Sequence, residues 1–201
     1  MDTDTVLAAS AFAISMSGTP GPNNAMLAAS GATFGFRRTL PHMLGITAGF
    51  PAMLVVVALG GGGLLRAAPV LHEALKWTGA AYLLWLAFKI GTARPGATAP
   101  GARTLPLTAL QAALFQWVNP KAWIIVVSAI ATYTGNAATI LGPSLALAAI
   151  FVAATLPSTA LWTMTGVGAA RLLRSERGLR GFNLAMAALL VASLLPLLRS
   201  D

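Results

Sequence analysis

Long apolar runs separated by short polar connectors dominate the chain. A helix that spans a bilayer needs about 20 predominantly apolar residues, and six segments approach or exceed that length. They are Val6–Thr33, Leu40–Leu65, Leu75–Ile90, Leu107–Tyr133, Ile140–Val167 and Phe182–Leu198. The pattern therefore predicts an all-α polytopic membrane protein with six transmembrane helices, of which the third and the sixth are short.

The composition fits a membrane setting. Hydrophobic residues make up 57% of the 201 residues, charged residues only 9%, and the mean hydropathy is +0.76. A soluble domain carries about 25% charged residues, so most of this surface must face lipid. The chain has no cysteine, which excludes disulfides and thiolate sites. We expect no cofactor and, because the basic residues lie in short connectors, no nucleic-acid partner despite a net charge of +8.

The basic residues divide unequally between the two sides of the predicted spans. One side receives nine of them: Arg37, Arg38, Lys89, Arg94, Arg103, Arg171, Arg174, Arg177 and Arg180. The other side receives Arg66, Lys76 and Arg199. The positive-inside rule predicts a multi-pass protein of the bacterial inner (plasma) membrane with both termini outside. An alternative with five spans and an inward N-terminus requires one short run to stay out of the membrane.

Two predicted spans are interrupted near their middle. Residues 18–24 read Gly-Thr-Pro-Gly-Pro-Asn-Asn, and residues 116–121 read Gln-Trp-Val-Asn-Pro-Lys. Proline removes a backbone N–H and clashes with the preceding turn, so neither segment continues a regular helix. Broken helices at matching places in two halves are typical of transporters built as inverted repeats. The alternative is that the prolines only kink their helices, which membrane helices tolerate.

The breaks predict one transmembrane domain over residues 1–201 with a 3+3 inverted repeat. The first three-helix half covers residues 1–98, the second covers 107–201, and a cytoplasmic linker covers 91–106. Because each half contains an odd number of spans, the two halves run in opposite orientations. The unit is small enough that a homodimer is compatible with it.

The residues after each break suit an anionic group. A half-helix begins at each break, and its free N–H groups and dipole favour an anion. Asn23 and Asn24 add amide groups to the first site, and Lys121 adds a positive charge to the second. A charge inside the membrane is costly and is a functional candidate by default. Lys121 could instead, or in addition, snorkel to the headgroups or satisfy the carbonyls of the broken helix as a structural strut.

Acidic residues are missing from the predicted spans. All five lie in termini or loops: Asp2, Asp4, Glu73, Glu176 and Asp201. The two histidines, His42 and His72, lie near span ends, and an interfacial position suits His42. We therefore expect no metal site, because metal cations prefer carboxylate, histidine or thiolate ligands. Without a buried carboxylate, the candidates for proton coupling are Lys121, His42 and the substrate's own amine.

With these motifs in view, the chain resembles the LysE/RhtB family of amino-acid exporters nearly from end to end. The similarity is strongest at 19–24, 35–38 and 44–49, at 79–87, and at 115–122, and it points to the cysteine/O-acetylserine exporter branch. The resemblance implies a non-enzymatic efflux translocator for an amino acid or a close derivative, driven by the proton motive force. The family elements, which are the candidate substrate-binding residues, map to Pro20, Gly21, Pro22, Asn23, Asn24, Asn119, Pro120 and Lys121. The alternatives are an exporter of cations or another small solute, or a non-transporting membrane protein.

Overall fold

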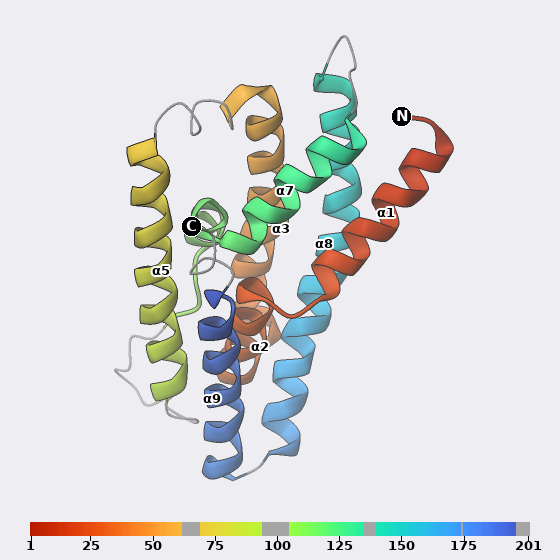
Figure 1. Cartoon of the computed structure of the whole chain (residues 1–201). Helices are drawn as coiled ribbons and strands as arrows, with labels where there is room; N and C mark the ends of the chain where they lie inside the picture. The colour runs from red at the N-terminus through yellow and green to blue at the C-terminus, as the bar shows by residue number, and fades with distance from the viewer. Residues whose placement is uncertain (62–68, 94–104, 135–139, 174, 196–201) are drawn as a thin grey trace.

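The structure is a computed structural model that describes residues 1–61, 69–93, 105–134, 140–173 and 175–195 (Figure 1). This part is almost entirely helical and contains no strand, so the all-α class is confirmed. The elements are α1 (Thr3–Gly18), α2 (Pro22–Phe34), α3 (Phe36–Val56), η1 (Val57–Gly61), α5 (Pro69–Thr92), α6 (Ala109–Phe115), η2 (Gln116–Val118), α7 (Pro120–Tyr133), α8 (Leu141–Leu172) and α9 (Glu176–Ala192). Most of the predicted linker and several predicted basic residues lie outside the described residues: Arg66, Arg94, Arg103, Arg174 and Arg199.

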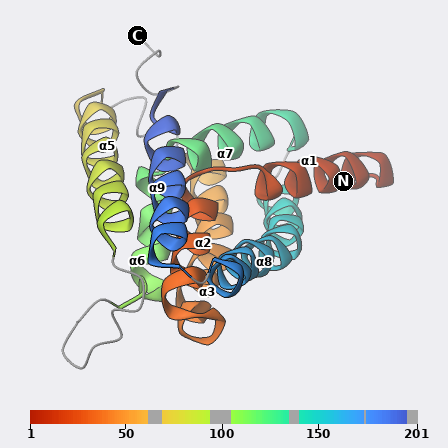
Figure 2. The same ribbon diagram turned by 90° about the horizontal axis from the view of Figure 1, so that it is seen from below.

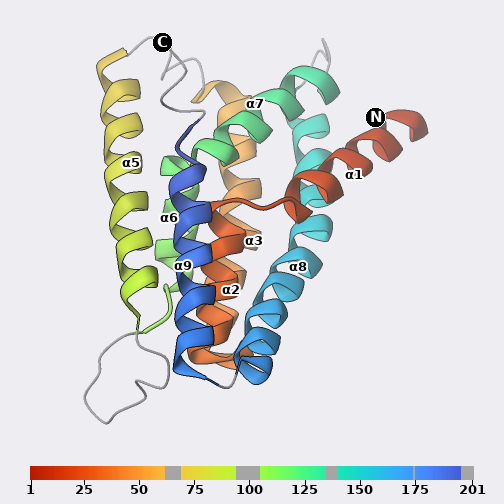
Figure 3. The same cartoon turned by 60° about the horizontal axis from the view of Figure 1, so that its bottom comes forward.

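The helices form a bundle from which two oblique helices extend. α3, α5, α8 and α9 run roughly along the long axis, and α2 lies among them in one half of the molecule (Figures 1 and 3). α1 and α7 cross the other half obliquely and reach out to the same side of the bundle (Figure 2). Both interrupted spans of the sequence therefore change direction at their breaks.

Within the described residues, few helices are long and apolar enough to cross a membrane alone. Phe36–Gly61, which joins α3 and η1, and the 32-residue α8 are long and apolar enough to do so. The bent pair Ala109–Val118 and Pro120–Tyr133 supplies a third crossing if it counts as one span. α1, α2 and α9 have 16, 13 and 17 residues, each short of the roughly 20 that a crossing requires. The count of six spans therefore stays a prediction.

Glycine permits two close helix crossings that fix the bundle. A Cβ atom on Gly31 of α2 would lie 2.2 Å from the Thr163 carbonyl oxygen, and one on Gly166 of α8 would lie 1.9 Å from the Ala28 carbonyl oxygen. Neither position has room for a side chain, so α2 and α8 meet backbone to backbone. α3 approaches α6 in the same manner at Gly45.

Two apolar clusters hold the breaks between them. The first joins α1, α3, α7 and α8, and it includes the ring pair of Phe50 and Phe151, whose centroids are 5.0 Å apart. The second joins α2, α5 and α9 around Phe115, the last residue of α6. At each break the chain therefore passes from one of these two clusters into the other.

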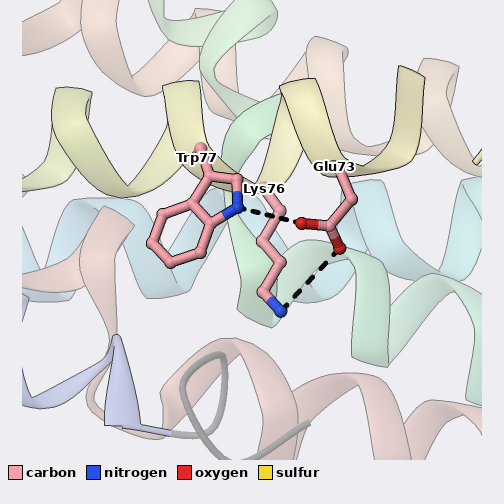
Figure 4. Close-up of polar contacts among 3 residues, drawn as sticks. All are labelled: Glu73, Lys76 and Trp77. Atoms are coloured by element: carbon pink, nitrogen blue, oxygen red, sulfur yellow. Dashed lines mark hydrogen bonds and ion pairs between the residues drawn. The ribbon is translucent and has the colours of Figure 1, made fainter. Parts of the chain in front are cut away.

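Polar side chains anchor the start of α5. Glu73 accepts a hydrogen bond of 2.9 Å from the Trp77 indole N–H and pairs with Lys76 at 3.9 Å (Figure 4). Lys76 Nζ also lies 5.7 Å from the centroid of the Trp77 ring. Amphipathic aromatic and basic side chains of this kind favour the headgroup region, so the cluster suits the end of a spanning helix.

Candidate functional site

The first break leaves helical carbonyls without their usual partners. Pro20 and Pro22 have no N–H, so the carbonyls of Met16 and Gly18 lose their intrahelical donors. Thr19 Oγ1 donates to the Met16 carbonyl at 3.1 Å, and the indole N–H of Trp162 in α8 donates to the Gly18 carbonyl at 3.3 Å. In a membrane such groups must be satisfied within the protein, and here side chains do so.

Asn24 spans the break from the side of α2. Its Nδ2 donates to the Ser17 carbonyl at 2.9 Å and to the Thr19 carbonyl at 2.8 Å. The Ser17 carbonyl also accepts a bond of 2.7 Å from Ser158 Oγ of α8. Asn24 is buried and both of its amide hydrogens are occupied, so in this structure it holds the shape of the break rather than offering donors to a ligand.

Lys121, from the second break, reaches into the first. Its Nζ donates to the Thr19 carbonyl at 2.7 Å, to Thr19 Oγ1 at 2.8 Å and to the Pro20 carbonyl at 3.2 Å. We call these three contacts the Lys121 bridge. An ammonium group has three donors, so all are used. The predicted role of Lys121 as a strut for the broken helix is therefore what the geometry shows. Gly21 leaves room for the Lys121 side chain, because a Cβ atom at position 21 would lie 2.7 Å from Lys121 Cδ.

A second direct contact joins the breaks through two amides. Asn23 Nδ2 donates to Gln116 Oε1 at 2.9 Å, and Gln116 Nε2 donates to Asn23 Oδ1 at 3.2 Å. Gln116 is completely buried and also donates to the Ala112 carbonyl at 2.8 Å. The two contacts together connect residues about a hundred positions apart in the sequence.

The second break is capped locally. α6 and η2 meet α7 at an angle of 71° around Asn119. Asn119 Oδ1 accepts the Lys121 backbone N–H at 3.2 Å, and its carbonyl accepts the N–H groups of Ala122 and Trp123 at 3.0 and 3.3 Å. The first turn of α7 therefore has its donors occupied, whereas the sequence predicted free donors at both half-helices.

The first turn of α2 differs. Gly21 precedes it without a capping side chain, and Pro22 supplies no N–H. Ala25 N–H bonds the Gly21 carbonyl at 2.9 Å, and no partner within the described residues is assigned to the backbone N–H groups of Asn23 and Asn24. Two donors at a positive helix end are thus left for another group.

A cavity of about 50 Å³ lies against both breaks. Met16, Ile46, Phe50, Ile125 and Phe151 give it an apolar wall. The polar residues that line it are Ser17, Asn23, Asn24, Asn119, Lys121, Thr155, Ser158 and Thr159. Ligand sites usually measure roughly 300–1,000 Å³, so this space must widen before it admits an amino acid.

The structure gathers the predicted site residues but divides their roles. Gly21, Asn23, Asn24, Asn119 and Lys121 line the cavity. Pro20, Pro22 and Pro120 do not line it and instead set the direction of the chain: Pro22 and Pro120 begin α2 and α7, and the Pro20 carbonyl accepts from Lys121.

Sequence reasoning missed the contribution of α8. Thr155, Ser158 and Thr159 line the cavity and surround Pro157, a proline inside α8. The sequence feature that could have identified these residues is the polar cluster around a proline within a long apolar helix.

His42 is buried inside the bundle, where its side chain is 1% exposed. The predicted interfacial depth of His42 in the membrane stays a prediction. Neither ring nitrogen has a hydrogen-bond partner among the described residues, and His42 does not line the cavity. The surrounding turn of α3 packs against its neighbours, which hides a residue that its position in the sequence placed near a span end. The described residues contain no group of three His, Cys, Asp or Glu side chains close enough to hold a metal ion.

Comparison with known proteins places the chain in a family. The sequence profile of the family described as "LysE type translocator" matches residues 14–199. The chain is 30% identical to the "Cysteine/O-acetylserine efflux protein" of Escherichia coli strain K12 and 31% identical to that of Escherichia coli O1:K1 / APEC. Each alignment covers 177 residues, 86% of this chain and 87% of the relative. No solved structure matches. The chain therefore belongs to the LysE type translocator family, and it is a multi-pass membrane transporter rather than an enzyme.

Proposed function

We propose that the chain exports a small amino acid of the cysteine or O-acetylserine type across the bacterial inner membrane. Its class as an amino-acid efflux transporter rests on the family match and on relatives named for that activity. The particular substrate, the binding residues, the orientation with both termini outside and the driving force are parts of the proposal. The six-span arrangement belongs to it as well.

One observation carries the proposal: a positive charge from the second break is held in the first break at the wall of a shared cavity. Lys121 lines that cavity together with Asn23 and the start of α2. Among the residues that the structure describes, no Asp or Glu lines it. A cationic group and unpaired N–H donors in a site without carboxylates suit an anionic group, and the carboxylate of an amino acid is such a group.

We infer that the substrate carboxylate competes for Lys121. Charge-assisted hydrogen bonds are roughly twice as strong as neutral ones, so a carboxylate at the α2 N-terminus draws Nζ away from the carbonyls of Thr19 and Pro20. Giving up the Lys121 bridge removes one of the two direct contacts between the breaks. Binding would thereby loosen the contact that must change when the site opens to the other side of the membrane.

Part of the packing supports the proposed inverted repeat of residues 1–98 and 107–201, although α2 packs against α8 far more extensively than its counterpart α7 packs against α3. α1 packs against α8, and α6 packs against α3, which are equivalent pairs if the halves are related by a two-fold axis. α3 also packs against α8, and α5 against α9, as self-equivalent pairs require. Rocking of one half against the other then exposes the cavity in alternation.

For proton coupling we favour Lys121 over His42. Lys121 lines the cavity, where a proton and a substrate can exchange, whereas His42 does not. The substrate's own amine is the remaining candidate.

The proposal is tested by uptake of labelled amino acids into inside-out vesicles that contain the full chain. The panel is cysteine, O-acetylserine, threonine, homoserine, leucine and lysine, with wild type compared with Asn23→Ala. We expect wild type to accumulate cysteine or O-acetylserine and the correctly inserted variant to do so far more slowly. If wild type moves none of the six, the proposed substrate class is wrong.

A further inference from the structure

The cavity wall formed by α8 presents a chemistry that the carboxylate site does not use. Thr155, Ser158 and Thr159 all line the cavity, and Thr155 and Thr159 are 6% and 2% exposed. Two of these hydroxyl-bearing residues are buried and Ser158 is half-buried, so a polar patch of α8 lies at the cavity that Lys121 also lines. The inference below rests on the proposed transport of an amino acid.

The hydroxyl hydrogens on this wall are already used. Ser158 Oγ donates to the Ser17 carbonyl at 2.7 Å, and Thr159 Oγ1 donates to the Leu156 carbonyl at 2.8 Å. A hydroxyl has one donor and two acceptor lone pairs, so these two oxygens can now only accept. Thr155 Oγ1 lies 3.4 Å from Ser17 Oγ, and either of the two can be the donor.

The two walls of the cavity are therefore complementary. The α2 wall has the backbone N–H groups of Asn23 and Asn24, for which no partner within the described residues is assigned. The Lys121 ammonium also lies at this wall, and it becomes a donor to the substrate once a carboxylate draws it from the carbonyls of Thr19 and Pro20. The α8 wall offers neutral acceptors. A carboxylate has no hydrogen to donate, so it would be repelled by the hydroxyl oxygens of α8. An ammonium group, by contrast, can donate hydrogen bonds to these oxygens.

We propose that Ser158 and Thr159 form the subsite for the α-ammonium group of the substrate. The subsite fixes the orientation of the zwitterion, with its carboxylate toward α2 and Lys121 and its ammonium toward α8. It makes a free ammonium a requirement for tight binding, so that N-acylated or deaminated analogues are poor ligands.

A purely structural role for such hydroxyls is the competing explanation, and the chain contains its own control. Thr163 of α8 is fully buried and its Oγ1 donates to the Thr159 carbonyl at 2.8 Å, yet it does not line the cavity. Thr163→Val thus removes a buried back-bonding hydroxyl of the same helix without touching the proposed subsite. Thr159→Val removes the acceptor, and Thr159→Ser restores it.

The test uses the purified full chain in proteoliposomes and labelled cysteine under reducing conditions. The KM for cysteine is compared with the inhibition constants of two analogues. Mercaptopropionate is cysteine without the ammonium, and cysteine methyl ester keeps the ammonium but lacks the carboxylate. Because the chain has no cysteine, thiol ligands do not react with it.

We expect Thr159→Val to raise the KM for cysteine and the inhibition constant of the ester by about tenfold, the size of one lost bond to a charged group. Mercaptopropionate should inhibit wild type weakly and Thr159→Val to the same extent. Thr159→Ser should restore the wild-type KM, and Thr163→Val should leave all three constants unchanged.

Two results would overturn the subsite while leaving amino-acid transport intact. One is wild type that binds mercaptopropionate as tightly as cysteine, a measurement that needs no variant to fold. The other is a Thr159→Val protein that transports cysteine with wild-type KM, or whose three constants change equally. Wild type that moves no amino acid contradicts the proposed function itself.

Discussion

The two breaks satisfy the backbone groups that lose their helical partners by different means. Both interrupt an apolar helix with proline, and both start a new half-helix directly afterwards. The second break satisfies its backbone locally, because Asn119 caps α7 with its own side chain and carbonyl. The first break combines local partners, Thr19 and Asn24, with distant ones. The distant partners are Trp162 and Ser158 from α8 and Lys121 from α7.

This difference indicates which break can change. A locally capped bend keeps its shape whatever its neighbours do, so the angle between α6 and α7 is a fixed feature. A break whose carbonyls are held by side chains of other helices keeps its shape only while those helices stay in place. The first break is therefore the one whose geometry responds to a ligand or to movement of the halves, and Lys121 is the contact through which it responds.

The largest effect is expected from Lys121→Met, which removes the charge and the Lys121 bridge but keeps an unbranched side chain. Efflux of the transported amino acid should fall roughly tenfold to a hundredfold, the loss of one or more bonds to a charged group. Vesicle assays normalised to inserted protein measure it. Lys89→Met is the matched control, because Lys89 is exposed and lies over the Trp85 ring instead of the cavity. Equal losses in both variants would contradict a specific role for Lys121.

Asn24→Ala should have the next largest effect, on stability. It removes two hydrogen bonds that span the first break, and the free energy of unfolding should fall by about 2 kcal/mol. Thermal unfolding in detergent, followed by loss of the folded monodisperse protein, measures the change. A wild-type transition temperature would show that the first break does not need its side-chain partners.

Asn119→Ala should destabilise less, because it removes a single helix cap. Loss of an Asn cap costs about 1 kcal/mol, and Asn119→Ser should recover most of it, since serine is also a good N-cap. The same unfolding measurement applies to both variants. A loss larger than that of Asn24→Ala would reverse the comparison between the two breaks.

The smallest effect is expected from His42→Gln. His42 lies outside the cavity lining, so the pH profile of efflux should keep its wild-type shape. The profile is measured in vesicles at a fixed substrate gradient. A flattened pH profile would indicate that His42, and not Lys121, carries the coupled proton.

The breaks and the half-helices after them could be predicted from the sequence, because proline and glycine act on the local backbone. Pro22 and Pro120 begin α2 and α7 as their fixed backbone geometry requires. The sequence also predicted that Lys121 could bond carbonyls of a broken helix, because a charge inside a membrane must find partners. It did not predict that these carbonyls belong to the first break, at Thr19 and Pro20.

The partners themselves could not be predicted. Ser158 and Trp162 meet the first break across more than 140 positions of sequence, and only the packing of α8 against α1 and α2 brings them there. The burial of His42 has the same origin. Its place near a span end is visible in the sequence, whereas the helices that cover it are not.

The Lys121 bridge holds the two breaks together beside a narrow cavity. The chain has no cysteine, so Thr155→Cys places one reporter thiol on the buried α8 wall. Its modification rate by a membrane-impermeant thiol reagent is measured with Lys121, with Lys121→Met and with Lys89→Met. We predict slow labelling with Lys121 and with Lys89→Met, and severalfold faster labelling with Lys121→Met. An unchanged rate in Lys121→Met would contradict the claim.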